Sequence, residues 1–362
     1  MISYNSAVTI ALDATPLTIS SGGVRRYTLE LARALAENYP EDRYWLLSDQ
    51  SYPKPDFSAA NLQYGGGARG SVEKRWWSWG VNREMSRVGV ELFHGTDFSV
   101  PYLPMRPSVM TLHDLSPWLY PGMQTGAQRV RRRTPRLLRL GLATMVITPS
   151  ETVRSAAIDL FRIDADRVVT VPLAASDHFR PVASDSSGIP YFLFVGTMEP
   201  RKNIARLIKA WREVRRTIDV DLVIAGRARE DFQAPYEEPG LRLLGEVAEE
   251  ELPRLYSGAL ACVYPSLYEG FGLPALEAMQ CGALVIASLD PAIREVTGDG
   301  AIHVDAEDSR ALAQAMESVA RTPLGFEGMR RRALDRASTF TWRRTARLTR
   351  EVYDAATRVF RK

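Results

Sequence analysis

The sequence has few of the residues and patterns that mark disulfide-rich, membrane-spanning or secreted proteins. Its 362 residues include two cysteines, Cys262 and Cys281. A disulfide scaffold is therefore not expected, and a reducing cytosol is the expected compartment. No apolar run approaches the roughly twenty residues that a membrane span needs. Residues 1–5 lack the charged and apolar regions of a signal peptide. These absences predict a cytoplasmic protein that is soluble or only touches a membrane surface.

Charge and metal-ligand patterns exclude further classes. A net charge of +3 is too small to predict a nucleic-acid partner. The histidines and cysteines form no cluster with the spacing of metal ligands. Two D-x-D matches occur, at 164–166 in a helix-to-strand turn and at 219–221 before a strand, and both positions favour a structural role. The sequence therefore predicts no metal site.

The length and the apolar pattern predict two α/β domains. The hydrophobic content of 45% is that of a globular protein, and 362 residues exceed one ordinary core. Strands are expected at 8–13, 44–48, 91–94, 108–114, 144–149 and 167–173, and then at 191–197, 221–226, 241–245, 261–264, 283–288 and 301–304. Helical patterns separate most of them, including 24–36, 72–89, 151–161, 203–217, 249–258 and 309–320. We expect two doubly wound parallel sheets, in domains 1–180 and 188–341, and a final helix at about 342–362.

The most informative stretch is 261–282. A buried strand is followed by a loop and then by a helix that Pro274 suits at its first turn. Gly270 and Gly272 leave backbone N–H groups bare at this helix start, where the helix dipole also favours an anion. Glu269 and Glu277 flank the spot, and carboxylates accept hydrogen bonds from ribose or sugar hydroxyls. The pattern is typical of a nucleotide-sugar site.

Two other interpretations of this stretch remain open from the pattern alone. Residues 270–275 also match a G-x-G-x-x-A dinucleotide fingerprint, with Asp290 about twenty residues further on. That match comes late in the chain, and a bulky Phe271 lies between its glycines. An ordinary strand–loop–helix is the second alternative, against which the pair of acids argues.

Three further strand ends carry candidate site residues. Arg201 and Lys202 precede a helix, where cations oppose the helix dipole, and this misfit favours a bound anion such as a diphosphate. Gly22 and Gly23 form a glycine loop before the first helix, a weaker anion signal. His113, followed by an aspartate, ends a strand on the side of the sheet where ligands bind in α/β proteins.

A basic segment allows two interpretations. Six arginines and no acid lie between Asp114 and Glu151, namely Arg129, Arg131, Arg132, Arg133, Arg136 and Arg139. With the leucines at 137, 138, 140 and 142, the segment Arg129–Arg139 either docks on an anionic membrane surface or is a solvated helix face over core leucines. The tryptophans at 76, 77 and 79 are expected to serve packing.

Together these motifs resemble the retaining glycosyltransferases of family 4, which have the GT-B fold. The resemblance runs nearly end to end, through the glycine pair, His113, residues 172–176, residues 196–203 and the E-x7-E stretch. Residues 111–116 are most similar to bacterial mannosyltransferases that build surface polysaccharides. The resemblance implies two Rossmann-like domains facing across a cleft, with the last helix crossing back to the first domain.

The resemblance also implies roles for individual residues. Arg201 and Lys202 would bind the donor diphosphate, Glu277 the ribose, and Glu269 the transferred sugar, with His113 beside that sugar. The remaining nucleotide-sugar contacts would come from Gly22, Gly23, Gly196, Thr197, Gly245, Val247, Gly270, Phe271, Gly272 and Leu273.

The implied reaction transfers a hexose with retention of configuration, without metal or another cofactor. Mannose from GDP-mannose is favoured over a UDP-hexose, and the acceptor would be a saccharide or lipid-linked saccharide. The implied location is the cytoplasm, with a possible peripheral site on the inner face of the plasma membrane. A nucleotide-sugar 2-epimerase and a non-catalytic nucleotide-sugar-binding subunit are the alternatives.

Overall fold

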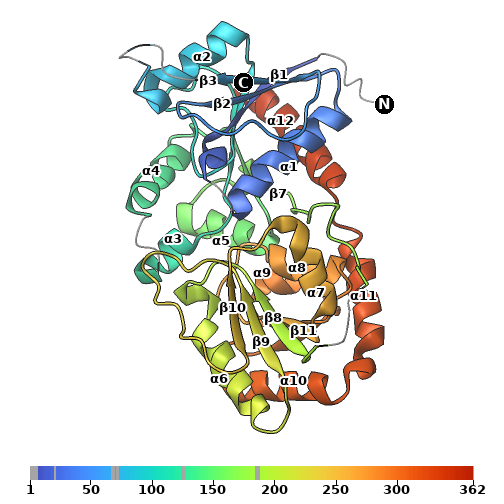
Figure 1. Cartoon of the computed structure of the whole chain (residues 1–362). Helices are drawn as coiled ribbons and strands as arrows, with labels where there is room; N and C mark the ends of the chain where they lie inside the picture. The colour runs from blue at the N-terminus through green and yellow to red at the C-terminus, as the bar shows by residue number, and fades with distance from the viewer. Residues whose placement is uncertain are drawn as a thin grey trace. The chain divides into compact units, whose positions relative to one another are not determined.

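The computed structural model divides the chain into two compact units (Figure 1). It describes residues 7–19, 22–66, 70, 73–123, 127–183 and 188–361. The first unit contains the described residues up to Trp118, the segment 127–173, and the residues from Trp342 onward. The second contains 119–123 and the described part of 174–341. Part of the linker predicted at 174–188 lies outside the described residues.

The first unit is built on a seven-stranded sheet in the order β3-β2-β1-β4-β5-β6-β7. Every neighbouring pair is parallel. The strands are β1 (Thr9–Asp13), β2 (Arg43–Ser48), β3 (Leu62–Gly66), β4 (Leu92–Gly95), β5 (Ser108–Thr111), β6 (Met145–Thr148) and β7 (Val168–Thr170). The central strands β4, β5 and β6 are buried at every position, without alternation, because helices cover both faces.

Helices of the first unit surround this sheet. They are α1 (Gly23–Asn38), α2 (Val81–Val88), α3 (Ser116–Leu119), α4 (Gln128–Arg139), α5 (Glu151–Phe161) and α12 (Trp342–Phe360). The helix predicted at 72–89 is wrong at its start, because a π-helix, Trp76–Gly80, precedes α2, and Val72 lies outside the described residues. Position 80 in this π-helix requires glycine, because a Cβ atom there would collide with the Glu73 carbonyl oxygen.

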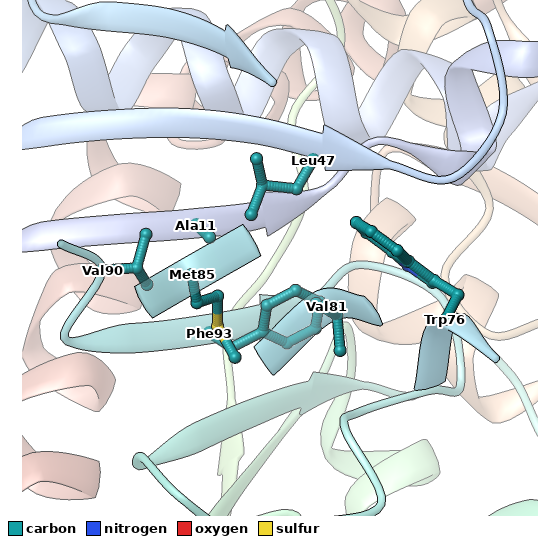
Figure 2. Close-up of a cluster of buried hydrophobic side chains, with 7 residues drawn as sticks. All are labelled: Ala11, Leu47, Trp76, Val81, Met85, Val90 and Phe93. Carbon is teal, nitrogen blue, oxygen red and sulfur yellow. The ribbon is translucent and has the colours of Figure 1, made fainter. Parts of the chain in front are cut away.

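The α2 region covers one face of the sheet through a compact apolar cluster. Figure 2 shows its members, which come from β1, β2, β4 and the α2 region: Ala11, Leu47, Trp76, Val81, Met85, Val90 and Phe93. Trp77 packs partly buried against the cluster, whereas Trp79 is 52% exposed. The packing role predicted for these tryptophans therefore applies to Trp76 and Trp77.

The C-terminal helix α12 belongs to the first unit, where it packs along α1, as the red and blue helices of Figure 1 show. The Arg350 guanidinium Nε lies 2.6 Å from Asp42 Oδ2, and both residues are buried. The Tyr353 hydroxyl lies 2.7 Å from Nδ1 of His94 on β4. The predicted return of the last helix to the first domain is confirmed.

The second unit repeats the architecture with a six-stranded parallel sheet, in the order β10-β9-β8-β11-β12-β13. Its strands are β8 (Tyr191–Val195), β9 (Asp221–Ala225), β10 (Leu241–Gly245), β11 (Ala261–Tyr264), β12 (Val285–Ser288) and β13 (Ala301–Val304). Its helices are α6 (Ile204–Arg215), α7 (Leu252–Gly258), α8 (Leu273–Gln280), α9 (Pro291–Thr297), α10 (Ser309–Arg321) and α11 (Glu327–Ala337). The chain order reverses between β8 and β11, which is the switch point where doubly wound sheets bind ligands.

Candidate functional site

The predicted motifs of the second unit meet where β8, β9 and β11 end. Gly196 follows β8 and Gly226 follows β9, and a side chain at Gly226 would lie 2.0 Å from the Gly196 carbonyl oxygen. This close approach requires glycine. After β11, Gly272 takes a φ of +103° and directly precedes α8, so the loop 265–272 turns sharply into the helix. Thr197 and Lys202 follow β8 at the same edge of the sheet.

Glu269 joins the two predicted cations in one buried ionic cluster. Its Oε2 accepts a hydrogen bond from Arg201 Nη1 at 2.8 Å, and its Oε1 accepts one from Lys202 Nζ at 2.5 Å. The Lys202 ammonium also donates to the Tyr264 hydroxyl at 2.7 Å, and Arg201 donates to the Tyr268 carbonyl at 3.1 Å. Two motifs more than sixty residues apart in the sequence thus form a single site.

The charges of this cluster fix its protonation. Burial alone would raise the pKa of Glu269, but Arg201 and Lys202 outweigh it and lower that pKa to about 2. Burial and the nearby Arg201 lower the pKa of Lys202, while Glu269 opposes that shift. Glu269 is therefore an anion at every physiological pH.

A second buried acid, Glu199, extends the cluster. Its Oε1 lies 2.7 Å from Arg201 Nε, and its Oε2 accepts a hydrogen bond from Arg229 Nη1 at 2.8 Å. Arg229 in turn pairs with Asp231. Glu199 stands two residues before Arg201, so the sequence motif contains it, but nothing in the pattern assigns it a contact.

Glu277 lies on α8, with 2% of its surface exposed. The buried Tyr256 hydroxyl on α7 donates to Glu277 Oε2 at 2.9 Å. This bond was not predicted, because α7 and α8 meet only in the tertiary fold. It holds the carboxylate in one orientation in the second half of α8.

The contacts of Asp290 are not those expected of a ribose ligand in a dinucleotide-binding fingerprint. Its Oδ1 caps α9 by accepting from the Ile293 N–H at 3.1 Å, and its Oδ2 accepts from the Glu269 N–H at 3.3 Å. Burial raises its pKa to about 6. Asp290 therefore supports the loop that carries Glu269.

The other predicted contacts of the second unit lie in or beside this loop and at the end of β10. Gly270 and Phe271 are buried, and the Phe271 ring packs edge-on against Phe340. Leu273 is the first residue of α8. The Gly245 carbonyl accepts from the Gly226 N–H at 2.7 Å, and Val247, two residues on, is half-buried.

In the first unit, His113 lies in a polar network just after β5. Its Nε2 lies 2.7 Å from the Thr96 carbonyl oxygen, which only accepts, so Nε2 carries the proton. Burial lowers the pKa of His113, and the ring is therefore neutral with an unprotonated Nδ1. The Tyr27 ring packs edge-on against it, with centroids 4.7 Å apart. His113 thus offers a hydrogen-bond acceptor on a fixed ring.

The ends of neighbouring strands add acids of raised pKa to the first unit. Asp13 ends β1, and burial raises its pKa to about 7 although the Thr15 hydroxyl donates to it at 2.6 Å. Burial and Asp114 raise the pKa of Asp97, after β4, to about 6. Sequence reasoning missed both residues, because a single aspartate at a strand end carries no motif.

The glycine pair starts α1 as expected. Gly22 takes a φ of +127° and precedes the first residue of the helix, Gly23. Both glycines are exposed. The position suits an anion site at a helix N-terminus.

The basic segment forms α4, and four of its six arginines are exposed while the other two are half-buried. Leu137 and Leu138 are buried, as the solvated-face interpretation requires, whereas Leu140 is 72% exposed. The exposed arginines follow one face of the helix; they are Arg129, Arg132, Arg136 and Arg139. Pro135 cannot donate to the Arg131 carbonyl, which instead accepts from the Trp118 indole N–H at 3.2 Å.

Potential metal ligands remain dispersed. Within the described ranges, no three His, Cys, Asp or Glu side chains are grouped so that they could hold a metal ion. Asp219 and Asp221 both lie within 4 Å of Arg215, and Asp164 begins a 3₁₀ turn. No helix in the part of the chain that the structure describes is long and apolar enough to cross a membrane.

Comparison with known proteins identifies the family. A family described as Glycosyltransferase Family 4 matches residues 21–178, and one described as Glycosyl transferases group 1 matches residues 189–322. The chain is 35% identical to O-antigen chain mannosyltransferase B of Escherichia coli, over 72% of this chain and 74% of that protein. The chain belongs to glycosyltransferase family 4. It is therefore a glycosyltransferase.

Other relatives agree with this assignment. O-antigen chain mannosyltransferase RfbU of Salmonella typhimurium is 30% identical over 63% of this chain and 64% of its own length. Sucrose-phosphate synthase from Thermosynechococcus elongatus superposes with a TM-score of 0.76 at 20% identity, covering 96% of this chain and 98% of that one. Anabaena HepE in complex with UDP-glucose gives 0.74 at 16% identity, covering 97% and 100%. These structures share the fold, and the predicted GT-B architecture is confirmed.

Proposed function

We propose that this family 4 glycosyltransferase moves mannose from GDP-mannose to a saccharide or lipid-linked saccharide acceptor during synthesis of a surface polysaccharide. The cluster of Arg201, Lys202 and Glu269 at the switch point of the second sheet carries the proposal. Two cations at a helix start suit a diphosphate, and the acids beside them suit hydroxyl groups. The similarity to two O-antigen mannosyltransferases supports mannose as the transferred sugar.

The proposed donor contacts use the side chains of this cluster and of α8. Arg201 and Lys202 bind the diphosphate and stabilise the charge that develops on the departing nucleotide. The N–H groups at the start of α8, from Gly270 to Leu273, assist them. Glu277 accepts from the ribose hydroxyls.

The remaining donor contacts involve backbone and sugar. Glu269 accepts from hydroxyls of the transferred sugar. The nucleobase lies against the backbone at Gly245 to Val247, and Gly196 and Thr197 line the diphosphate. Gly22 and Gly23 add N–H groups from the start of α1.

We propose a metal-independent reaction with retention of configuration by front-face attack. The leaving phosphate oxygen takes the proton of the acceptor hydroxyl while the sugar becomes oxocarbenium-like. The His113 ring, which is neutral and can accept at Nδ1, hydrogen-bonds a hydroxyl of the transferred sugar. Arg201 and Lys202 supply the positive charge that a metal ion supplies in other transferases.

We further propose that α4 places the enzyme on an anionic membrane surface. Its exposed stripe, Arg129, Arg132, Arg136 and Arg139, has no ion-pair partner among the described residues. A basic residue near an anionic surface contributes about 1 kcal/mol. The exposed Leu140 follows at the end of the helix. A lipid-linked acceptor would then be presented on the surface where the enzyme docks.

Nucleotide binding and product analysis test the proposed function. In a thermal-shift panel, GDP and GDP-mannose should raise the melting temperature more than UDP and UDP-hexoses, because ligands that bind only the folded state stabilise it. Incubation with GDP-mannose and an α-mannosyl acceptor in EDTA should yield a product whose new linkage is α by NMR. A β-linkage, a requirement for added metal, or stabilisation by the UDP series alone would contradict retention, metal independence or the donor, respectively.

A further inference from the structure

The buried acid Glu199 has no part in the donor contacts proposed above. It follows β8, and only 7% of its surface is exposed. Its two carboxylate oxygens bridge Arg201 and Arg229, at 2.7 and 2.8 Å. A carboxylate this well buried keeps its charge only when cations compensate for lost hydration. Glu199 is therefore an integral anion of the diphosphate site.

The cluster as a whole is electrically balanced. Its cations are Arg201, Lys202 and Arg229, and its anions are Glu199, Glu269 and Asp231. The formal charges sum to zero before any ligand binds. A site with the highest possible affinity for a diphosphate would leave its cations uncompensated, because each fixed anion repels the incoming phosphates.

This charge balance affects the binding of the nucleotide-sugar donor and of the nucleoside diphosphate product differently. In the nucleotide sugar, the sugar esterifies the terminal phosphate. In the free nucleoside diphosphate that phosphate is a monoester-type group with a second pKa of about 6, so the product carries about one more negative charge at neutral pH. A fixed anion near the diphosphate therefore weakens binding of the product more than binding of the donor.

We propose that Glu199 is a specificity-determining residue that lowers affinity for the free nucleoside diphosphate relative to the nucleotide sugar, and so speeds product release. The inference rests on the proposed binding of the diphosphate by Arg201. Glu269 cannot supply this function alone, because its contact with the sugar would change when the sugar leaves. Glu199, held between two guanidinium groups, stays in place throughout the cycle.

The Glu199→Gln variant tests this proposal, because it removes the charge and keeps the shape. Isothermal titration should measure Kd for GDP and GDP-mannose with wild type and variant. We expect GDP to bind the variant about tenfold more tightly, the order of one partly screened charge interaction. GDP-mannose affinity should rise less, and inhibition of transfer by GDP should become stronger. Loss of a merely structural contact would weaken the binding of both GDP and GDP-mannose, and it would not raise the affinity for GDP relative to that for GDP-mannose.

The control is Glu238→Gln, which makes the same charge change elsewhere in the second unit. Glu238 pairs with Arg212 and precedes β10, at the amino edge of the sheet. It should leave both dissociation constants unchanged. An equal loss of affinity for both ligands in Glu199→Gln, or an unchanged ratio of the GDP and GDP-mannose affinities, overturns this inference but not the proposed function. Wild-type protein that binds neither GDP, UDP nor their sugars overturns the proposed function and this inference with it.

Discussion

Replacement of Glu277 by glutamine is the sharpest test of nucleotide recognition. The Tyr256 hydroxyl donates to Glu277 Oε2, and the proposed ribose contact uses the other carboxylate oxygen. In Glu277→Gln, the amide oxygen can still accept from Tyr256, which leaves the NH₂ group where the ribose needs an acceptor. The loss of a hydrogen bond to a charged group costs about 1.5–3 kcal/mol, or roughly 10- to 150-fold in Kd.

The alanine variant is a poorer probe. Glu277→Ala leaves the fully buried Tyr256 hydroxyl without this acceptor, which costs about 1–3 kcal/mol of folding free energy. A lower melting temperature would accompany the loss of affinity and confuse its cause. Glu277→Gln should melt within a few degrees of wild type.

A double-mutant cycle against the ligand completes the assay. Titration of wild type and Glu277→Gln with GDP and with 2′,3′-dideoxy-GDP separates the ribose contact from any general change. Wild type should prefer GDP by about tenfold or more, and the variant should lose most of that preference. Equal preferences in the two proteins would refute the contact between Glu277 and the ribose, whatever the absolute affinities.

Three further predictions concern charge elsewhere in the chain. Arg201→Ala and Lys202→Ala should each lower transfer about a hundredfold or more, measured in EDTA, and restoration of activity by manganese or magnesium would contradict metal independence. Asp13→Asn should stabilise the fold by about 2–4 kcal/mol at pH 8 and by little near pH 4. Burial raises the pKa of Asp13 from its usual 3.8 to about 7 in the folded protein, so wild type loses stability as the pH rises between these two values and the asparagine variant does not. Urea denaturation at both pH values checks this prediction, and an equal effect at both would contradict it. Arg132→Glu with Arg136→Glu should abolish salt-sensitive co-sedimentation with anionic liposomes while GDP binding persists, and unchanged partition would reduce α4 to a solvated face.

The arrangement of strands and motifs was largely predictable from local sequence. Apolar runs bounded by glycine or proline predict β8 and β11, and parallel strands place their carboxyl ends at one edge. Arg201, Lys202 and Glu269 could therefore be assigned to one edge of the sheet. The helix expected at 72–89 failed because three tryptophans give no periodic signal for a π-helix.

The pairing of charges was not predictable. Sequence reasoning left Arg201 and Lys202 as cations awaiting a ligand, whereas the fold gives them Glu199 and Glu269 as counter-ions. Such contacts depend on side-chain directions across two loops, which no spacing rule encodes. The Tyr256 bond to Glu277 was missed for the same reason, because α7 and α8 pack through tertiary contacts.

The two strand-end sites differ in electrostatic character, and this difference bears on their division of labour. In the second unit, Glu269 has a pKa of about 2 and stays ionised beside Arg201 and Lys202. In the first unit, His113 is neutral, and Asp13 and Asp97 titrate at about 7 and 6. A diphosphate requires fixed charge, whereas sugar hydroxyls are matched by groups that accept and donate hydrogen bonds at little desolvation cost. The chemistry therefore supports the proposed diphosphate binding by the second unit, and it suits the groups of the first unit to hydroxyl-rich ligands such as sugars.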